Sequence, residues 1–193
     1  MRLFTGIAIP NTVVDRVEQT LALLRPSADL RWTPAVNLHI TTKFIGPWTE
    51  AMLPRLQQAL AGVDIPDNLQ ITISGFGYYP NPHNPTTFFA AVRAPGLYHL
   101  NRALDEILEP LGCPRQASPF SPHLTLARIH RQDTGPLRER IATLHDFDFG
   151  VFTASEFHLY QSTAGTQGSV YIPLATWPLT RKAPLTKKEV FAC

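Results

Sequence analysis

Cysteine and charge are both scarce in this sequence of 193 residues. Its two cysteines, Cys113 and Cys193, form no spacing pattern, so the sequence predicts neither a disulfide framework nor a cysteine-based metal site. Charged residues make up 17% of the chain and leave a formal net charge of +2. This mild positive balance permits an anionic ligand, but it is too small for a protein that coats long nucleic-acid duplexes.

Long apolar runs and two common hydrolase motifs are also absent. The first apolar segment ends at Pro10 and lacks the cleavage site of a signal peptide, and no segment has the length of a transmembrane helix. We therefore expect a cytoplasmic protein that does not bind membranes. The sequence contains neither HExxH nor GxSxG, which argues against a zinc hydrolase and against a Ser-His-Asp hydrolase. No metal and no cofactor are predicted.

The residues that are present suffice for one well-packed domain. Hydrophobic residues account for 44% of the chain, which is enough to form a substantial core. We expect residues 1–180 to form a single domain of two packed lobes, and we expect the protein to be a monomer. Residues 181–193 are polar and basic, and this tail is predicted to be flexible.

Apolar periodicity predicts strands and helices in two successive rounds. The first round comprises a strand at 3–9, a helix from Asn11 to Pro26, a strand at 37–46, a helix that starts at Thr49 or Glu50, and a strand at 69–79. The second round comprises a strand at 87–92, a helix at 95–111, a strand at 121–128, a helix at 136–144, and strands at 149–160 and 170–177. The predicted fold class is α+β.

The two rounds match in spacing as well as in order. His39 and His123 lie 84 positions apart, and so do the helix starts at Asn11 and Pro95. An internal duplication accounts for this repeat. It predicts a bilobal, pseudo-symmetric molecule in which each lobe is an antiparallel sheet with helices on its outer face. The active-site cleft is then expected between the two lobes.

The strand at 37–46 has one chemically unusual face. Strict alternation places His39, Thr41 and Lys43 on that face, with about 6–7 Å between successive side chains. The opposite, apolar face is predicted to carry Leu38, Ile40 and Phe44. An imidazole can transfer a proton at neutral pH, and a hydroxyl and an ammonium can bind an anionic oxygen.

The strand at 121–128 repeats this arrangement. Leu124 and Leu126 face one way, and His123 and Thr125 face the other. A single histidine in a strand is usually a structural residue. Two His-x-Thr strands at matched positions of a repeat reverse that expectation, and they predict a site that transfers protons at an anionic group.

Four segments resemble motifs of the 2H phosphoesterase superfamily, in particular the RNA 2′,3′-cyclic phosphodiesterases, also called the LigT or 2′–5′ RNA ligase family. Residues 2–10 resemble RLFVAIxLP, residues 37–46 resemble NLHLTLRFLG, residues 119–128 resemble PFxPHLTLAR, and residues 157–162 resemble FxLYxS. The chain departs from the pattern at Lys43, where the family often has Arg, and at Thr42, where Leu is common.

The resemblance implies a reaction and roles for four residues. It implies metal-independent hydrolysis of RNA 2′,3′-cyclic phosphate ends to 2′-phosphomonoesters, with weak 2′–5′ ligation in reverse. By resemblance, His39 is the proton donor and His123 is the proton acceptor. Thr41 and Thr125 would donate hydrogen bonds to the non-bridging phosphate oxygens. The implied partners are RNA ends or nucleotides that carry the cyclic phosphate.

Several assignments stay open at the level of sequence. Lys43 and Phe120 are further candidates for substrate binding, and Arg128 reaches the phosphate only if its strand bulges or twists. The aromatic residues that could stack a terminal base are Trp32, Tyr78, Tyr79 and Phe120. The alternative functions are a nucleotide- or RNA-end-binding module without turnover, and a phosphodiesterase for ADP-ribose cyclic phosphate or 2′–5′ oligoadenylate.

Overall fold

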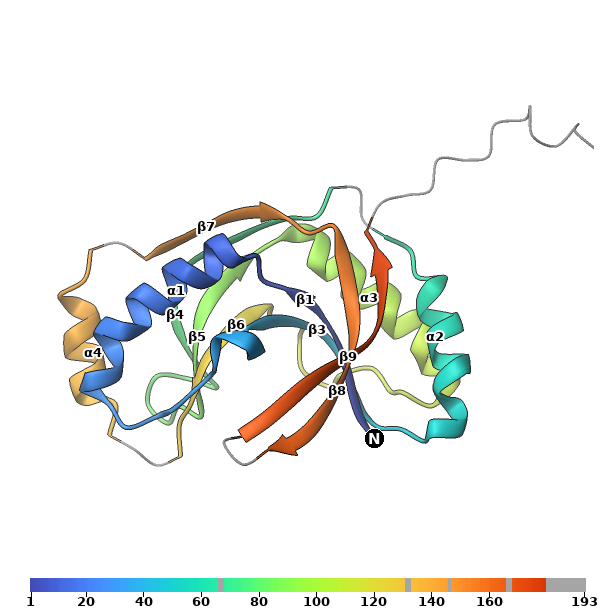
Figure 1. Cartoon of the computed structure of the whole chain (residues 1–193), viewed down its shortest axis with the longest axis horizontal. Helices are drawn as coiled ribbons and strands as arrows, with labels where there is room; N and C mark the ends of the chain where they lie inside the picture. Colours follow the sequence, from blue (N-terminus) through green and yellow to red (C-terminus); the bar gives the residue numbers. More distant parts are fainter. Residues whose placement is uncertain (66–67, 131–132, 146, 166–167, 180–193) are drawn as a thin grey trace, which may run out of the picture.

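The computed structural model describes residues 1–65, 68–130, 133–145, 147–165 and 168–179. The described strands form one antiparallel sheet in the order β7-β4-β5-β6-β3-β1-β8-β9, and β2 pairs with β6 (Figure 1). The strands are β1 (Arg2–Ala8), β2 (Arg31–Trp32), β3 (His39–Pro47), β4 (Gln70–Tyr79), β5 (Thr87–Arg93), β6 (His123–Arg128), β7 (Asp148–Thr153), β8 (Glu156–Gly165) and β9 (Gly168–Pro178). The tail predicted at 181–193 lies outside the described residues.

Helices pack on the outer side of this curled sheet in two pairs (Figure 1). The helices are α1 (Asn11–Leu24), α2 (Leu53–Ala61), α3 (Pro95–Leu108) and α4 (Gly135–Ala142). Helix α1 packs with α4 and against β7, whereas α2 packs with α3, which lies against β3. The longest described helices have 14 residues, and none in the described part of the chain is long and apolar enough to cross a membrane.

The apolar stripes read from the sequence are the faces that these helices bury. In α1 the buried residues are Val13, Val17, Leu21 and Leu24, which recur at the spacing of one helical face. Pro95 occupies the first turn of α3, where a missing N–H removes no helical hydrogen bond. The α+β class with an antiparallel sheet is therefore confirmed.

The prediction of a separate sheet for each half of the sequence is wrong. Strand β8 comes from the second half but pairs with β1, and β4 comes from the first half but pairs with β5. The continuous sheet has two parts, β7-β4-β5-β6 and β3-β1-β8-β9, and each half of the chain contributes strands and helices to both parts. The two parts of the sheet meet at β3 and β6, which are joined through the single register pair Ile40↔Leu124.

The strand predicted at 149–160 is also corrected, because two strands occupy this segment. Strand β7 pairs with β4, whereas β8 pairs with β1 and β9. After β7 the chain leaves this edge of the sheet and crosses to β8. At this point the Ala154 N–H donates to the Leu69 carbonyl at 2.9 Å. Continuous apolar patterning cannot reveal this break, since both strands bury side chains on the same core.

Candidate active site

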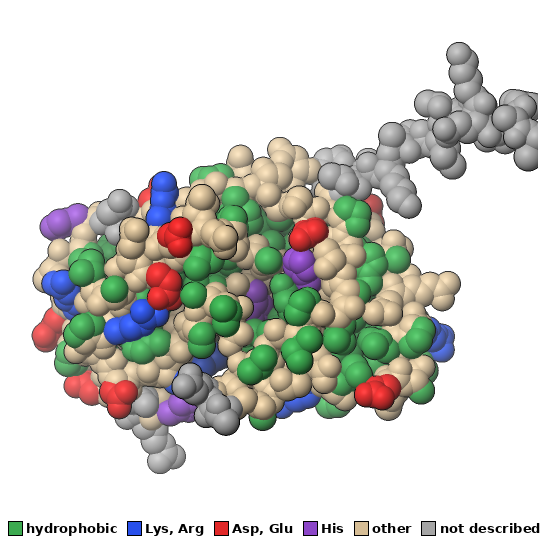
Figure 2. Space-filling model, in the orientation of Figure 1, with side chains coloured by type: hydrophobic (Ala, Val, Ile, Leu, Met, Phe, Trp, Pro, Cys, Tyr) green, Lys and Arg blue, Asp and Glu red, His purple; other side chains and the backbone are tan. Residues whose placement is uncertain are grey.

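A cleft of about 670 Å³ lies on the inner face of the sheet, where β3 and β6 meet. Figure 2 shows histidine side chains recessed near the middle of one face of the molecule. The cleft is lined by Arg2, Leu3, Phe4, Arg31, Trp32, Thr33, Pro34, Asn37, His39, Thr41, Phe44, Gly46, His123, Thr125, Arg128, His130, Ser162, Thr163, Ala164, Gly168, Ser169 and Tyr171.

The junction of β3 and β6 brings the two His-x-Thr motifs together. Ile40 and Leu124 are register partners and both are fully buried in the core. Side chains alternate along a strand, so the residues on either side of this pair point into the cleft. The antiparallel course brings His39 toward Thr125 and Thr41 toward His123. The two histidines are then diagonal neighbours, with about 7–8 Å between their Cα atoms.

Each imidazole is oriented by a hydrogen bond to the backbone carbonyl two residues before it. His39 Nδ1 lies 2.7 Å from the Asn37 carbonyl oxygen, and His123 Nδ1 lies 2.8 Å from the Ser121 carbonyl oxygen. A carbonyl can only accept, so Nδ1 carries the hydrogen in each ring. Nε2 is therefore the atom that gains or loses a proton in both residues. In His39 this atom lies 3.0 Å from Thr41 Oγ1.

Both histidines favour the neutral state in the absence of a ligand. Burial is the main cause that lowers the pKa of His39, and the charges of His123 and Arg128 lower it further. Burial likewise lowers the pKa of His123, with a smaller contribution from Arg128. In each case the hydrogen bond to the backbone carbonyl opposes the shift of the pKa. An anion in the cleft would favour protonation of these rings.

A β-bulge at Thr42 overturns the alternation predicted for β3. Thr41 faces Gly6 on β1, whereas Lys43 faces Thr5, so Thr42 is an extra residue on β3. Directly after this bulge, Lys43 and Phe44 are each on the opposite face from the one predicted. Phe44 points into the cleft and is 55% exposed, and Lys43 is turned into the core.

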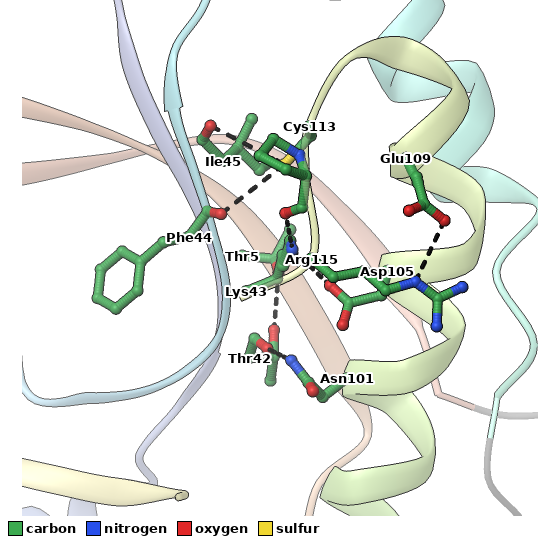
Figure 3. A network of polar contacts seen from close by, with 11 residues as sticks. Thr5, Thr42, Lys43, Phe44, Ile45, Asn101, Asp105, Glu109, Cys113 and Arg115 are labelled. Carbon is green, nitrogen blue, oxygen red and sulfur yellow. Dashed lines mark hydrogen bonds and ion pairs between the residues drawn. The ribbon is translucent and has the colours of Figure 1, made fainter. Parts of the chain in front are cut away.

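Lys43 is therefore not in the cleft, and its predicted role in substrate binding is wrong. Its ammonium is buried against α3, where it forms an ion pair with Asp105 and donates to the Pro114 carbonyl at 2.7 Å (Figure 3). The bulge itself is held from the same side. Asn101 Nδ2 donates to the Thr42 carbonyl at 2.7 Å, and the hydroxyls of Thr5 and Thr42 are 2.8 Å apart.

A matching bulge at Leu126 brings Arg128 into the cleft. On β5, Phe88 pairs with Ala127 and Phe89 pairs with Thr125, so Leu126 is the extra residue on β6. Arg128 consequently lies on the side of His123 and Thr125. Its Nη1 donates to Thr87 Oγ1 at 2.7 Å, which fixes the guanidinium beside the two motifs.

The structure separates the four aromatic candidates. Trp32 is among the residues that line the cleft, whereas Tyr78, Tyr79 and Phe120 are not. Phe120 packs edge-on against Tyr98 of α3, with ring centroids 5.6 Å apart. The expectation that Phe120 contacts substrate therefore has no support in its position.

Other aromatic residues surround His39 instead, and sequence reasoning missed them. The ring of Phe4 lies 4.8 Å from the His39 ring, and that of Tyr171 lies 5.0 Å away, edge-on. Gly6 lies beneath the imidazole, since a Cβ at this position would be 3.4 Å from His39 Cδ2 and 3.0 Å from the Ile40 carbonyl oxygen. Of these residues only Phe4 and Gly6 lie near a recognised motif, and Tyr171 carries no sequence signal.

The cleft is suited to an anion. The described residues that line it include three arginines, Arg2, Arg31 and Arg128, and no Asp or Glu. The whole chain has a net charge of only +2, so positive charge is concentrated at this site. In the described part of the chain, no three His, Cys, Asp or Glu side chains are grouped as ligands for a metal ion.

Comparison with known proteins agrees with this geometry. The family model described as the 2′-5′ RNA ligase superfamily matches residues 13–166. The RNA 2′,3′-cyclic phosphodiesterase of Archaeoglobus fulgidus is 28% identical over 172 residues, which cover 89% of this chain and 96% of that protein. The protein of the same name from Thermus thermophilus is 33% identical over 137 residues, which cover 66% of this chain and 68% of that protein.

Solved structures show the same fold. Escherichia coli LigT in complex with 3′-AMP has a TM-score of 0.76 and 25% identity, with 93% of this chain and 98% of that chain covered. The complex of the same protein with NADP+ has a TM-score of 0.71 and 26% identity over the same shares of the two chains. These relatives share the curled antiparallel sheet, and both complexes hold a nucleotide.

Proposed function

The chain belongs to the 2′-5′ RNA ligase superfamily, and from that premise we propose that it hydrolyses RNA 2′,3′-cyclic phosphate ends to 2′-phosphomonoesters by a two-histidine mechanism. One observation carries the proposal: two imidazoles, each with Nδ1 bound to a backbone carbonyl, line one cationic cleft from adjacent strands. Curated relatives over most of the chain are named RNA 2′,3′-cyclic phosphodiesterase.

The proposed reaction is an in-line displacement at phosphorus. His123 Nε2 accepts a proton from a water molecule as the water oxygen bonds to phosphorus. His39 Nε2 donates a proton to the 3′ oxygen as the bond between that oxygen and phosphorus breaks. The 2′ oxygen keeps the phosphate, and a proton exchange with solvent restores both histidines. When the 5′ hydroxyl of a second RNA end attacks phosphorus in place of water, the same displacement expels the 3′ oxygen and leaves a 2′–5′ phosphodiester, which accounts for weak 2′–5′ ligation.

Three further side chains have proposed roles at the phosphate. Thr41 and Thr125 lie in the cleft on the strands of His39 and His123, where their hydroxyls can donate to the non-bridging oxygens. Arg128 supplies a fixed positive charge beside them. Donors and charges that are in place before the reaction stabilise the additional negative charge of the transition state.

Substrate binding sets the required protonation states. The pKa of His39 is lowered in the free protein, yet a general acid must be protonated. The phosphate anion of the substrate lies next to this ring in the proposed complex and raises its pKa again. We therefore expect the pH profile of kcat to extend to higher pH than that of kcat/KM.

The two matched bulges support the finer proposal of a duplicated chain. Each lies directly after the Thr of a His-x-Thr motif, and each reverses the facing of the residues that follow. Two copies of one ancestral unit would produce this agreement, with one proton-transfer group supplied from each side of the cleft.

One assay separates the proposed activity from its alternatives. The protein is incubated, with and without EDTA, with each of four substrates: a 2′,3′-cyclic nucleotide, an oligonucleotide with a cyclic phosphate end, ADP-ribose cyclic phosphate and a 2′–5′ oligoadenylate. We expect hydrolysis of the first two substrates to the 2′-phosphomonoester. Binding without turnover would identify a nucleotide-binding module, and loss of activity in EDTA would show that a metal carries the chemistry.

A further inference from the structure

Two of the three cleft arginines are not required by a single reacting phosphate. Arg128 already lies beside His123 and Thr125, whereas Arg2 and Arg31 are exposed residues on other strands that line the same cleft. The backbone of Arg31 lies on β2 and pairs with Arg128 on β6, whereas its guanidinium lies against Gly168 of β9. Arg2 lies on β1, which is the His39 side. The substrate therefore meets positive charge beyond the reacting phosphate.

Arg2 lines the cleft from β1, farther along this strand than Gly6 and Phe4, which contact His39 of β3. Gly6 lies beneath the His39 ring, and the Phe4 ring packs against that ring. Because side chains alternate along a strand, Arg2 is on the same face, and its Cα lies about 13 Å beyond that of Gly6. One nucleotide and an extended arginine side chain together cover this span.

The backbone around Arg2 is fixed on both sides. Arg2 pairs with Pro47 on β3 and with Ser162 on β8. The preceding residue is held as well, since the Met1 amino group donates to the Trp48 carbonyl and the Trp48 N–H donates to the Met1 carbonyl, both at 2.7 Å. The guanidinium thus extends from an anchored strand end.

Phe44 lies between the histidines and Arg2. It is the register partner of Phe4, and its ring is 6.3 Å from the Phe4 ring. Phe44 lines the cleft and is 55% exposed, although aromatic residues usually bury much of their surface. A base or ribose that packs on this ring would direct the rest of the nucleotide toward Arg2.

The direction of the displacement selects Arg2 over Arg31. In the proposed reaction His39 protonates the departing 3′ oxygen, so the ribose lies on the His39 side of phosphorus and water enters from the His123 side. The nucleotide then extends along β1 and β3. We propose, on the basis of the proposed function, that Arg2 binds the 5′-phosphate of the nucleotide whose cyclic phosphate reacts. The preferred substrate is accordingly an oligonucleotide end.

The test compares ligands that differ only in the 5′-phosphate. The kcat/KM for a nucleoside 2′,3′-cyclic phosphate is measured with and without a 5′-phosphate. Equilibrium binding of the 2′-monophosphate and the 2′,5′-bisphosphate of the same nucleoside is measured in parallel by calorimetry. The variants are Arg2→Gln, Arg31→Gln as the matched charge change elsewhere in the cleft, and Arg55→Gln on the exposed surface of α2.

In the wild-type protein we expect the 5′-phosphate to improve both kcat/KM and affinity by about tenfold, as for one charge-assisted contact. Arg2→Gln should remove this preference, and Arg31→Gln and Arg55→Gln should keep it. Arg2→Gln should also reduce the slope of log affinity against log salt by about 0.7 for the bisphosphate alone.

Two results would overturn the subsite: no 5′-phosphate preference in the wild-type protein, or loss of that preference in Arg31→Gln rather than in Arg2→Gln. Failure of the proposed reaction gives a different result. A protein that hydrolyses no cyclic phosphate but shows an Arg2-dependent preference for the bisphosphate has the subsite without the reaction. A protein that hydrolyses the cyclic phosphate but shows no preference for the 5′-phosphate has the reaction without the subsite.

Discussion

The two His-x-Thr strands have the same backbone course but carry different side chains at matched positions. A bulge follows the Thr in each strand, at Thr42 and at Leu126, and turns the fifth residue after the His toward the cleft. That residue is Phe44 on β3 and Arg128 on β6. One backbone device therefore places an aromatic ring on one side of the proposed phosphate site and a cation on the other.

The surroundings of the two histidines differ in the same way. The His39 ring lies among the aromatic rings of Phe4, Tyr160 and Tyr171, at centroid distances of 4.8 to 6.1 Å. His123 has the ring of Phe89 at 5.2 Å and the charge of Arg128 nearby. The comparison teaches that a symmetric backbone holds an asymmetric site, with a side suited to a nucleoside and a side suited to charge.

Removal of either histidine is the most severe test of this comparison. His39→Ala and His123→Ala should each reduce kcat by about 10²–10⁴-fold, because each removes one proton-transfer group. The wild-type profile of activity against pH should be a bell. His39→Ala should flatten its alkaline limb, and His123→Ala should flatten its acidic limb.

Thermal unfolding of both histidine variants is the control. We expect stability changes of about 1 kcal/mol or less, since neither side chain fills the core between the sheet and the helices. If the two limbs of the profile respond in the opposite order, the roles of donor and acceptor are exchanged between the strands.

The fourth residue after each His allows a comparison of stability. Lys43 is fully buried and depends on Asp105, whereas Ala127 at the matched position needs no counter-ion. Asp105→Asn should lower the free energy of unfolding by about 3–5 kcal/mol, because it leaves an ammonium buried without its charge partner. Denaturant titration measures this loss.

Two variants complete the stability test. Lys43→Met in the Asp105→Asn background should recover most of the loss, since the uncompensated charge is then removed. Glu109→Gln breaks the exposed pair with Arg115 and should change stability by about 1 kcal/mol or less. An Asp105→Asn protein as stable as the wild type would show that Lys43 is solvated by some other route.

The two threonines test how far the symmetry of the site extends. Thr41→Ala and Thr125→Ala should each lower kcat by about 10–1000-fold through the loss of one donor to the phosphate. Thr41 also lies 3.0 Å from His39 Nε2, so Thr41→Ala should in addition shift the alkaline limb of the pH profile. Wild-type rates in both variants would assign the hydroxyls a structural role only.

Phe44 tests the nucleoside side of the cleft. Phe44→Ala should raise KM by about 5–150-fold, the equivalent of 1–3 kcal/mol for one stacked base, with little change in kcat. Phe120→Ala is the matched control, because that ring packs on Tyr98 outside the cleft. Equal effects of the two substitutions on KM would contradict a specific contact at Phe44.

The smallest effect concerns stability against pH. The pKa values of His39 and His123 are lowered from 6.5 by burial, so the unfolded chain binds more protons as the pH falls below that value. Each histidine should therefore reduce stability on acidification by at most about 1.4 kcal/mol per pH unit. Urea midpoints at pH 7.5 and 5.5 should differ less in His39→Gln and in His123→Gln than in the wild type.

Local patterns of the sequence were sufficient to predict most of the elements and the central motifs, although not the break between β7 and β8. The alternation around His39 and His123 places each His and Thr on the face that lines the cleft. The buried stripe of α1 has the spacing of a helical face. These features depend on residues close together in the chain, and their periods are set by backbone geometry.

The features that the sequence did not reveal depend on distant contacts. Alternation failed at Lys43 and Phe44 because the bulge is held by Asn101 and Thr5, which no local pattern connects to Thr42. The prediction of a separate sheet for each half failed for the same reason, because the pairs β1–β8 and β4–β5 join residues from different halves. A repeat in sequence order gives the content of each half, but it does not determine which edge each strand pairs with.

The pairing of β1 with β8 has a consequence for folding during synthesis on the ribosome. Strand β1 is synthesised first, yet one of its two partners is a strand that ends at Gly165. The His39 side of the cleft is completed only when most of the chain has emerged, because a contact between such distant residues forms late. Until then one edge of β1 is unpaired and is open to pairing with another chain.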